Sequence, residues 1–181
     1  MKKENQRIML TKRLLRETLI KMLREMPIDK VSITKLCHAS GINRSTFYSH
    51  YNTPGDILFD IKRDFATQAV KSLKSLTPNA TPKEQLVRIC EYISANADLE
   101  KIILANSTDD EVTDAIIGRT FDMWYVAERL MKNKNIDKET HHLATVFFHH
   151  GLFRVIREWI MNDIQKSPYE IAEILNKLIF T

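Results

Sequence analysis

Residues 32–51, with the sequence SITKLCHASGINRSTFYSHY, decide how the first part of the chain folds. Ser32 can cap a short helix because its hydroxyl oxygen can accept a hydrogen bond from a backbone N–H of the first turn. Gly41 follows that helix, and glycine readily adopts the left-handed conformation in which helices end. Asn43 can cap a second helix in the same way as Ser32. The stretch therefore predicts two short helices joined by a tight turn.

The second helix, expected over residues 44–51, has two chemically different faces. Phe47 and Tyr51 are four residues apart, so they share one face, which we expect to lie toward the core. The opposite face suits the major groove of DNA, because it offers hydrogen-bonding side chains and no carboxylate. Its residues are Arg44, Ser45, Thr46, Tyr48, Ser49 and His50. An ordinary helical hairpin inside a core is the alternative interpretation of this pattern.

The positive charge of the chain is concentrated around this motif. Residues 1–55 contain eleven Lys or Arg and four Asp or Glu, a formal net charge of +7. The whole chain has a net charge of +4, so residues 56–181 carry −3. Because DNA phosphates attract positively charged surfaces, this distribution favours DNA binding over a hairpin in a core.

Residues 11–58 resemble the DNA-binding domain of the TetR/AcrR transcriptional regulators. The matching segments are TKRLLRETLIKMLRE, ITKLCHASGINRSTFYSHY and DIL, within which G-I-N-R-S-T-F-Y-x-H-Y is the most specific part. The resemblance also implies a phosphate-binding lysine at the start of the next helix, but this chain has Asn52-Thr53-Pro54-Gly55-Asp56 there. The residues that the resemblance places on DNA are Arg44, Ser45, Thr46, Tyr48 and His50.

Two further DNA contacts are expected outside the second helix. A helix over residues 11–26 would begin near Thr11, where free backbone N–H groups could meet a phosphate. Thr34, in the first helix of the motif, is the other candidate. The complete set of candidate DNA-binding residues is Thr11, Thr34, Arg44, Ser45, Thr46, Tyr48, Ser49 and His50.

The rest of the chain predicts an all-α protein. Apolar residues recur at helical spacing, and four glycines and five prolines in 181 residues are too few for the turns of an all-β fold. We expect a three-helix DNA-binding domain at 1–53 and a helical ligand-binding and dimerisation domain at 54–181. A helix over 54–76 would leave the motif and enter the second domain. Further helices are predicted over 82–97, 109–134, 137–163 and 168–180, the first of them capped by Thr81, Pro82 and Glu84.

The last two predicted helices indicate a homodimer. Residues 137–163 are apolar around most of the helix circumference, and residues 168–180 carry a one-sided apolar stripe. One chain of this size has difficulty covering both helices, whereas a second copy would form a four-helix bundle with them. The resemblance agrees, because TetR/AcrR regulators typically dimerise through their last two long helices. The expected partner is a palindromic double-stranded operator.

The second domain is the expected receiver of a signal. Candidate pocket residues are the aromatic and Met residues of this domain, although such spacing is also typical of a plain core: Phe121, Trp124, Phe147 and Phe148, together with Met123 and Phe153. The favoured function is a repressor released by a small-molecule effector. The alternative is an activator or adaptor whose second domain binds a protein.

Other classes of protein are disfavoured. There is no phosphate-binding loop and no catalytic or metal motif, so we expect neither an enzyme nor a cofactor. His142 and His149 lie two helical turns apart, about 10 Å along the axis, too far to chelate one metal ion. We read them with His141 and His150 as interfacial residues of undetermined role. No apolar run of about 18 residues exists, and Cys37 and Cys90 suit a reducing cytosol, so a cytoplasmic protein without a membrane span is expected.

Overall fold

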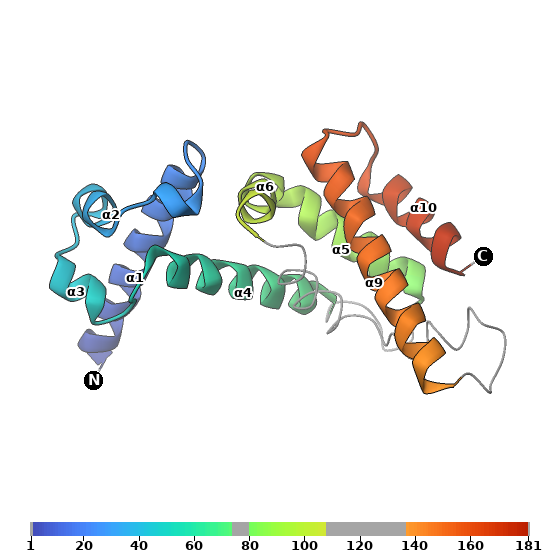
Figure 1. The fold of residues 1–181 in the computed structure, drawn as a ribbon, viewed down its shortest axis with the longest axis horizontal. Coiled ribbons are helices and arrows are strands. Elements are labelled where there is room, and N and C mark those ends of the chain that lie inside the picture. Colours follow the sequence, from blue (N-terminus) through green and yellow to red (C-terminus); the bar gives the residue numbers. More distant parts are fainter. Residues whose placement is uncertain (1, 74–79, 108–136, 181) are drawn as a thin grey trace. The chain divides into compact units, whose positions relative to one another are not determined.

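The computed structural model describes residues 2–73, 80–107 and 137–180 (Figure 1). Within these ranges the chain forms eight α-helices, one short 3-10 helix and no strand, which confirms the predicted all-α class. It divides into two compact units, Met1–Asp64 and Phe65–Thr181. This division falls inside α4 (Pro54–Ser72). The boundary expected between residues 53 and 54 separates a DNA-binding part from a ligand-binding and dimerisation part, and it stays a prediction. None of the helices in these ranges combines the length and apolarity needed to cross a membrane.

Helix α1 (Lys2–Leu23) starts earlier than predicted. The expected start at Thr11 is wrong, because residues 2–10 contain no glycine or proline and simply extend the helix toward the N-terminus. Leu15, Leu19 and Leu23 face the core of the N-terminal unit and are buried. After α1, a 3-10 helix at Ile28–Lys30 leads into the motif.

The motif forms the two predicted helices, α2 (Ile33–Ser40) and α3 (Arg44–Tyr48). The Ser32 hydroxyl accepts a hydrogen bond from the Lys35 N–H at 3.2 Å, and the Asn43 side chain accepts one from the Ser45 N–H at 2.9 Å. Gly41 ends α2 with a φ of 66°, so the predicted caps and turn are confirmed. Helix α3 stops at Tyr48, and the predicted continuation to residue 51 is instead a turn.

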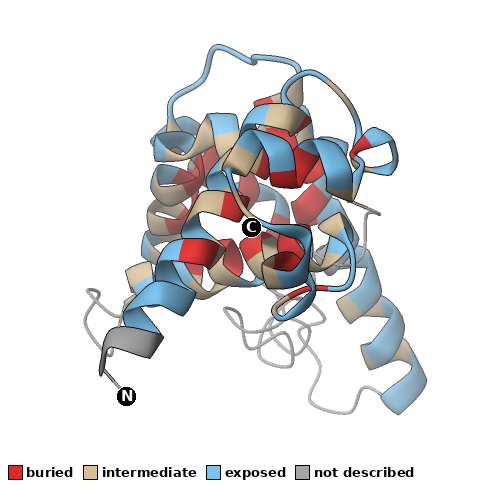
Figure 2. Ribbon diagram, turned by 90° about the vertical axis from the view of Figure 1, so that its left-hand side faces the viewer, coloured by how far each residue is buried: buried red, intermediate tan, exposed pale blue. Residues whose placement is uncertain are grey.

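Phe47 anchors α3 to the core of the N-terminal unit. Its side chain is completely buried, together with residues contributed by α1, α2 and α4. Figure 2 shows how buried stretches alternate with exposed ones along the helices. Helix α2 packs against both α1 and α3. The large, fully buried side chains of this core are Leu15, Leu19, Leu36, Phe47 and Ile57. A helix as short as α3 has little stability by itself, so this packing holds it in place.

The C-terminal unit contains the end of α4 followed by four described helices: α5 (Pro82–Ala95), α6 (Ala97–Ala105), α9 (Lys138–Met161) and α10 (Pro168–Phe180). The predicted capping box at Thr81 is confirmed, with Thr81 and Glu84 exchanging hydrogen bonds. Helix α10 packs mainly on α5 and also contacts α9, whereas α6 packs against α5 and α9. The helix predicted over 109–134 lies outside the described residues.

The two halves of α9 differ in burial. Its C-terminal half is buried through Leu152, Phe153, Ile156, Trp159 and Ile160. Trp159 Nε1 donates to the Lys166 carbonyl at 3.0 Å, and Arg157 donates to the Leu104 carbonyl of α6 at 3.1 Å. In the N-terminal half, Leu143 is 66% exposed and Phe147 is 71% exposed. The unit itself therefore covers mainly the second half of α9.

Candidate nucleic-acid interface

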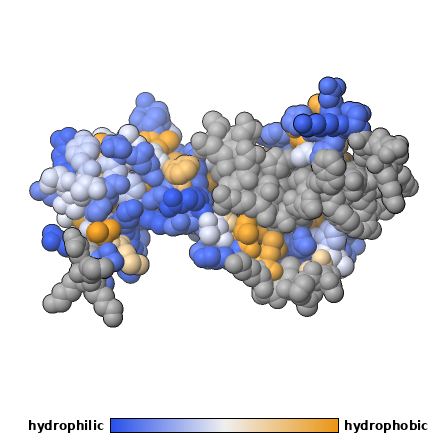
Figure 3. All heavy atoms as spheres, turned by 90° about the horizontal axis from the view of Figure 1, so that it is seen from below, coloured by the Kyte–Doolittle hydropathy of each residue, from blue (hydrophilic) through white to orange (hydrophobic). Residues whose placement is uncertain are grey.

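Helix α3 presents the candidate DNA-binding face on the side away from the core. Arg44, Ser45, Tyr48 and Ser49 are exposed, and Thr46 and His50 are half-buried. The Tyr48 ring lies edge-on to buried Phe47, with ring centroids 5.5 Å apart, so the packing that anchors α3 also orients this tyrosine. The exposed part of α3 therefore offers one guanidinium, one phenol and several hydroxyl groups. Where the N-terminal unit is seen from below, its surface atoms are mainly hydrophilic (Figure 3).

Two of these hydroxyl groups already donate hydrogen bonds within the chain. Ser45 Oγ donates to the Asn43 side chain at 3.1 Å, and Ser49 Oγ donates to the Thr46 carbonyl at 2.7 Å. The oxygen lone pairs of Ser45 and Ser49 remain available as acceptors, so these two hydroxyl groups can contact only donor groups on DNA. Arg44, Tyr48 and His50 are consequently the stronger candidates for donating to base edges or phosphates.

The two candidates outside α3 differ in their surroundings. Thr34 is exposed in the first turn of α2, as a DNA contact requires. Thr11 lies within α1 rather than at its start, and it is only 7% exposed. The predicted phosphate contact through free N–H groups at Thr11 therefore loses its basis, because interior helix N–H groups are bonded to carbonyls one turn back.

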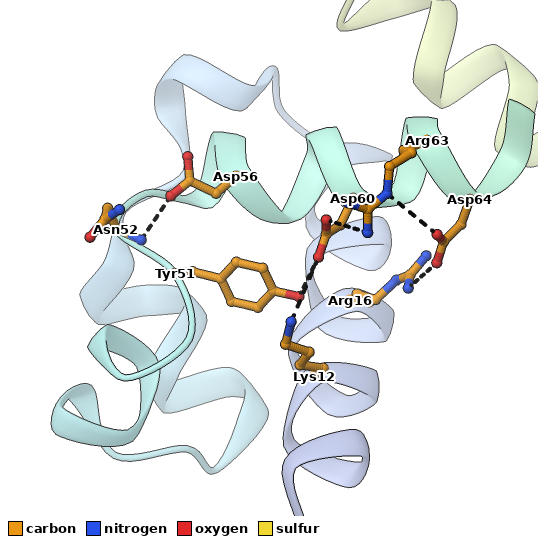
Figure 4. Close-up of polar contacts among 8 residues, drawn as sticks. All are labelled: Lys12, Arg16, Tyr51, Asn52, Asp56, Asp60, Arg63 and Asp64. Atoms are coloured by element: carbon orange, nitrogen blue, oxygen red, sulfur yellow. Dashed lines mark hydrogen bonds and ion pairs between the residues drawn. The ribbon is translucent and has the colours of Figure 1, made fainter. Parts of the chain in front are cut away.

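The start of α4 is capped by a carboxylate of the chain itself. Asp56 Oδ2 accepts a hydrogen bond from the backbone N–H of Asn52 at 2.7 Å (Figure 4). It also accepts one from the Thr53 N–H at 3.0 Å, and Thr53 Oγ1 accepts one from the Asp56 N–H. These bonds lower the pKa of Asp56 below its ordinary value, so it is ionised at neutral pH. The negative charge of the Asp56 carboxylate therefore lies at the N-terminal end of α4, where it would repel a phosphate. Together with the missing lysine, this makes the start of α4 a poor phosphate site.

Behind α3, a polar cluster joins Tyr51 to α1 and α4 (Figure 4). The Tyr51 hydroxyl donates to Asp60 Oδ2 at 3.1 Å, and Lys12 Nζ lies 4.0 Å from the same oxygen. Arg63 Nη2 lies 2.9 Å from Asp60 Oδ1. Sequence reasoning missed Lys12, Asp60 and Arg63, because the spacing of charged residues along helices does not reveal which of them meet in space.

The predicted ligand-pocket residues are only partly within the described chain. Phe121 and Trp124, like Met123, lie outside the described residues. Phe147 and Phe148 lie side by side on α9, with ring centroids 5.2 Å apart. They line an apolar groove of about 180 Å³ between α9 and α10, together with Gly151, Leu152, Val155, Leu175, Leu178 and Ile179.

The histidines of α9 do not form a metal centre with other described side chains. His142 and His150 are exposed, His141 is half-buried, and the side chain of His149 lies outside the description. In the described ranges, no group of three or more His, Cys, Asp or Glu side chains is arranged to hold a metal ion.

A comparison with known families agrees with this architecture. A TetR-type model, described as a transcriptional regulator C-terminal region, matches residues 80–181. The match covers more than half of the chain, and the protein belongs to the TetR family of transcriptional regulators. Regulators of this family are not enzymes, and at the level of the family they bind DNA and dimerise. No curated protein matches the chain.

Proposed function

We propose that this regulator reads a specific DNA sequence with α3 as its recognition helix in the major groove. The observation that carries the proposal is the capped helix α3, held by buried Phe47, whose opposite face is polar and free of carboxylates. The net charge of +7 on residues 1–55 adds the attraction to phosphate that DNA binding requires. Arg44 suits a bidentate contact with guanine, the commonest specific contact in the major groove.

We further propose that two copies assemble through α9 and α10. The support is the exposed apolar surface on these helices: Leu143, Val146 and Phe147 of α9 and Leu178 of α10. Such residues are costly to leave in water and mark interaction sites. The seam is narrower than the sequence predicts, because the second half of α9 and the Leu175 side chain are covered within the unit. A two-fold dimer would place two α3 helices on half-sites about 34–36 Å apart.

The groove beside Phe147 belongs to this seam rather than to an effector site. Its volume of about 180 Å³ is below the roughly 300–1,000 Å³ of typical small-molecule pockets. Its rim is formed by the exposed residues Phe147 and Leu178, so a side chain of the second copy would fit it better than a free ligand. We therefore reassign Phe147 and Phe148 from the ligand pocket to the proposed dimer seam.

The proposed regulatory behaviour is repression that a signal in the C-terminal unit releases. The dimer has one arrangement that fits DNA and another that does not. A signal lowers operator affinity only if its own affinity is higher for the arrangement that does not fit DNA. Helix α4 supplies residues to both units without a break, so it is the proposed route of coupling. A protein partner in place of a small molecule, with the chain acting as an activator or adaptor, is the alternative.

The test of the proposed function is selection of DNA by the full-length protein from a pool of random duplexes. We expect an enriched palindrome. Arg44→Ala should weaken binding to that duplex by about 1–3 kcal/mol if Arg44 reads a base edge, and Tyr48→Phe should weaken it less. Arg88→Ala, which also removes one guanidinium but lies on α5, outside the proposed seam, is the matched control. If both α3 variants bind within twofold of the wild type, α3 is not the recognition helix.

A further inference from the structure

The polar cluster behind α3 is built around a single carboxylate, Asp60 of α4 (Figure 4). Its side chain is only 17% exposed and meets three groups: the Tyr51 hydroxyl, the Lys12 ammonium and the Arg63 guanidinium. These groups come from the turn after α3, from α1 and from α4 itself. Asp60 is thus the point at which the end of α3 is tied to the two longest helices that contribute to the N-terminal unit.

Tyr51 is held at both its ring and its hydroxyl group. The side chain is 6% exposed, and its ring packs near Phe47 with centroids 6.3 Å apart. The Lys12 ammonium lies 5.1 Å from the centroid of the same ring. Burial, together with the hydrogen bond to Asp60, raises the pKa of Tyr51 to about 12, so its hydroxyl remains protonated and able to donate.

The two anchors of α3 differ in what they constrain. Phe47 holds the helix by apolar burial, which is non-directional and fixes the position of the helix more tightly than its angle. The hydrogen bond from Tyr51 to Asp60 is directional, because its strength falls steeply with angle. Since α3 has only five residues, a small change at its end redirects Arg44 and Tyr48.

We propose that Asp60 is a positioning residue for sequence reading, which sets the orientation of α3 through the Tyr51 hydroxyl. The inference rests on the proposed function and adds a residue that does not itself touch DNA. Asp60 carries a negative charge and Tyr51 is buried, so neither suits a phosphate contact. They act on recognition through Arg44 and Tyr48.

The sign of the effect separates positioning from simple electrostatics. Removing a carboxylate makes the protein more positive, and charge alone would then tighten binding to every DNA sequence. Loss of positioning should instead weaken binding to the preferred sequence and leave binding to other sequences unchanged or slightly tighter. Asp64 provides a matched control: it lies one turn further along α4 and pairs with Arg16 of α1 at 2.6 Å and with Arg63 at 3.9 Å, whereas the Tyr51 hydroxyl donates to Asp60.

The experiment compares Tyr51→Phe, Asp60→Ala, Asp60→Asn and Asp64→Ala with the wild-type full chain. Each protein is titrated with the duplex that the wild type selects and with a scrambled duplex of the same composition, and its thermal unfolding is followed. Tyr51→Phe and Asp60→Ala should bind the selected duplex roughly three- to tenfold more weakly, the range expected for one net hydrogen bond. Binding to the scrambled duplex should not weaken. Asp60→Asn keeps an acceptor oxygen and should recover most of the affinity, and Asp64→Ala should bind both duplexes at least as tightly as the wild type.

Several outcomes would overturn the inference. It is wrong if Tyr51→Phe and Asp60→Ala bind the selected duplex within twofold of the wild type. It is also wrong if they lose affinity for both duplexes in parallel with thermal stability, since Asp60 would then be a structural residue only. Tyr51→Phe keeps the packed ring, so its binding to the two duplexes can be interpreted even if Asp60→Ala fails to fold. A wild-type protein that selects no sequence would overturn the proposed function, and this inference with it, before any variant is made.

Discussion

The exposed faces of α3 and of the first half of α9 differ in chemistry although both lie on helices with a buried side. On α3 the exposed groups are hydroxyl, phenol and guanidinium, whereas on α9 they include the apolar side chains of Leu143, Val146 and Phe147. Neither the exposed polar groups of α3 nor the exposed apolar groups of α9 stabilise the helix that carries them. The difference therefore points to two classes of partner, a polyanion for α3 and another apolar surface for α9.

The largest expected effect comes from a charge placed behind the proposed seam. Leu175 of α10 is 1% exposed, so Leu175→Glu would bury an unpaired carboxylate in the C-terminal unit. We expect this variant to lose more than about 4 kcal/mol of the free energy of unfolding and to be largely unfolded at 37 °C. Circular dichroism measures the loss. A stable, fully helical variant would show that Leu175 lies at a surface instead.

A charge on the seam itself should separate the copies without unfolding either of them. Phe147 is 71% exposed, so Phe147→Glu should leave each copy folded while weakening dimerisation by about 2–4 kcal/mol, typical of a central interface residue. Sedimentation equilibrium measures the dissociation constant, and circular dichroism checks the fold. Phe59→Glu, at a comparably exposed phenylalanine of the N-terminal unit, is the matched control. Equal dimer affinity for both variants would remove α9 from the interface.

The buried carboxylate of α6 should make the C-terminal unit sensitive to pH. Glu100 is 2% exposed, Oε2 has no hydrogen-bond partner among the described residues, and burial raises its pKa to about 7. The folded state thus keeps a proton that the unfolded state releases near pH 4.5. This contribution to stability is complete below about pH 4.5 and is lost as the pH rises to about 7.

Glu100→Gln tests this directly because it keeps the size of the side chain and removes its charge. The variant should be more stable than the wild type above pH 7 by up to about 3 kcal/mol, and this advantage should disappear toward pH 4.5. Urea unfolding at pH 5 and pH 8 measures both values. Glu91→Gln, at an exposed glutamate of α5, should show no such difference. A difference that does not change with pH would mean that Glu100 is not the group responsible.

The smallest of these effects concerns the turn that presents α3. Gly41 has a φ of 66°, and a Cβ added there would meet no atom within 4 Å, so Gly41→Ala adds backbone strain but no clash. We expect a loss of about 1–2 kcal/mol in the free energy of unfolding. Gly41→Asn should lose less, since asparagine tolerates the left-handed conformation better. Thermal unfolding compares the two, and equal losses would contradict the backbone explanation.

Local signals made the motif predictable from sequence. Ser32, Gly41, Asn43 and the Thr81–Glu84 box all act within a few residues, so their hydrogen bonds depend on chain geometry that neighbouring residues already define. The start of α1 was missed for a related reason. Residues 2–10 carry no capping signal where α1 begins, whereas the apolar periodicity is clear only from Thr11 onward. The sequence pattern therefore predicts a helix start at Thr11.

The helical class follows from the amino-acid sequence alone, as do the capped turn between α2 and α3 and the acid-free face of α3, because each depends on residues within one or two helical turns of one another. Tertiary structure decided that Tyr51 donates to Asp60, that Asp60 also meets Lys12 from a distant helix, and that Leu175 is buried while Phe147 is exposed. Helical periodicity shows which side chains share a face. Which face is covered, and by what, depends on how the helices pack, and that packing brings together residues far apart in the chain.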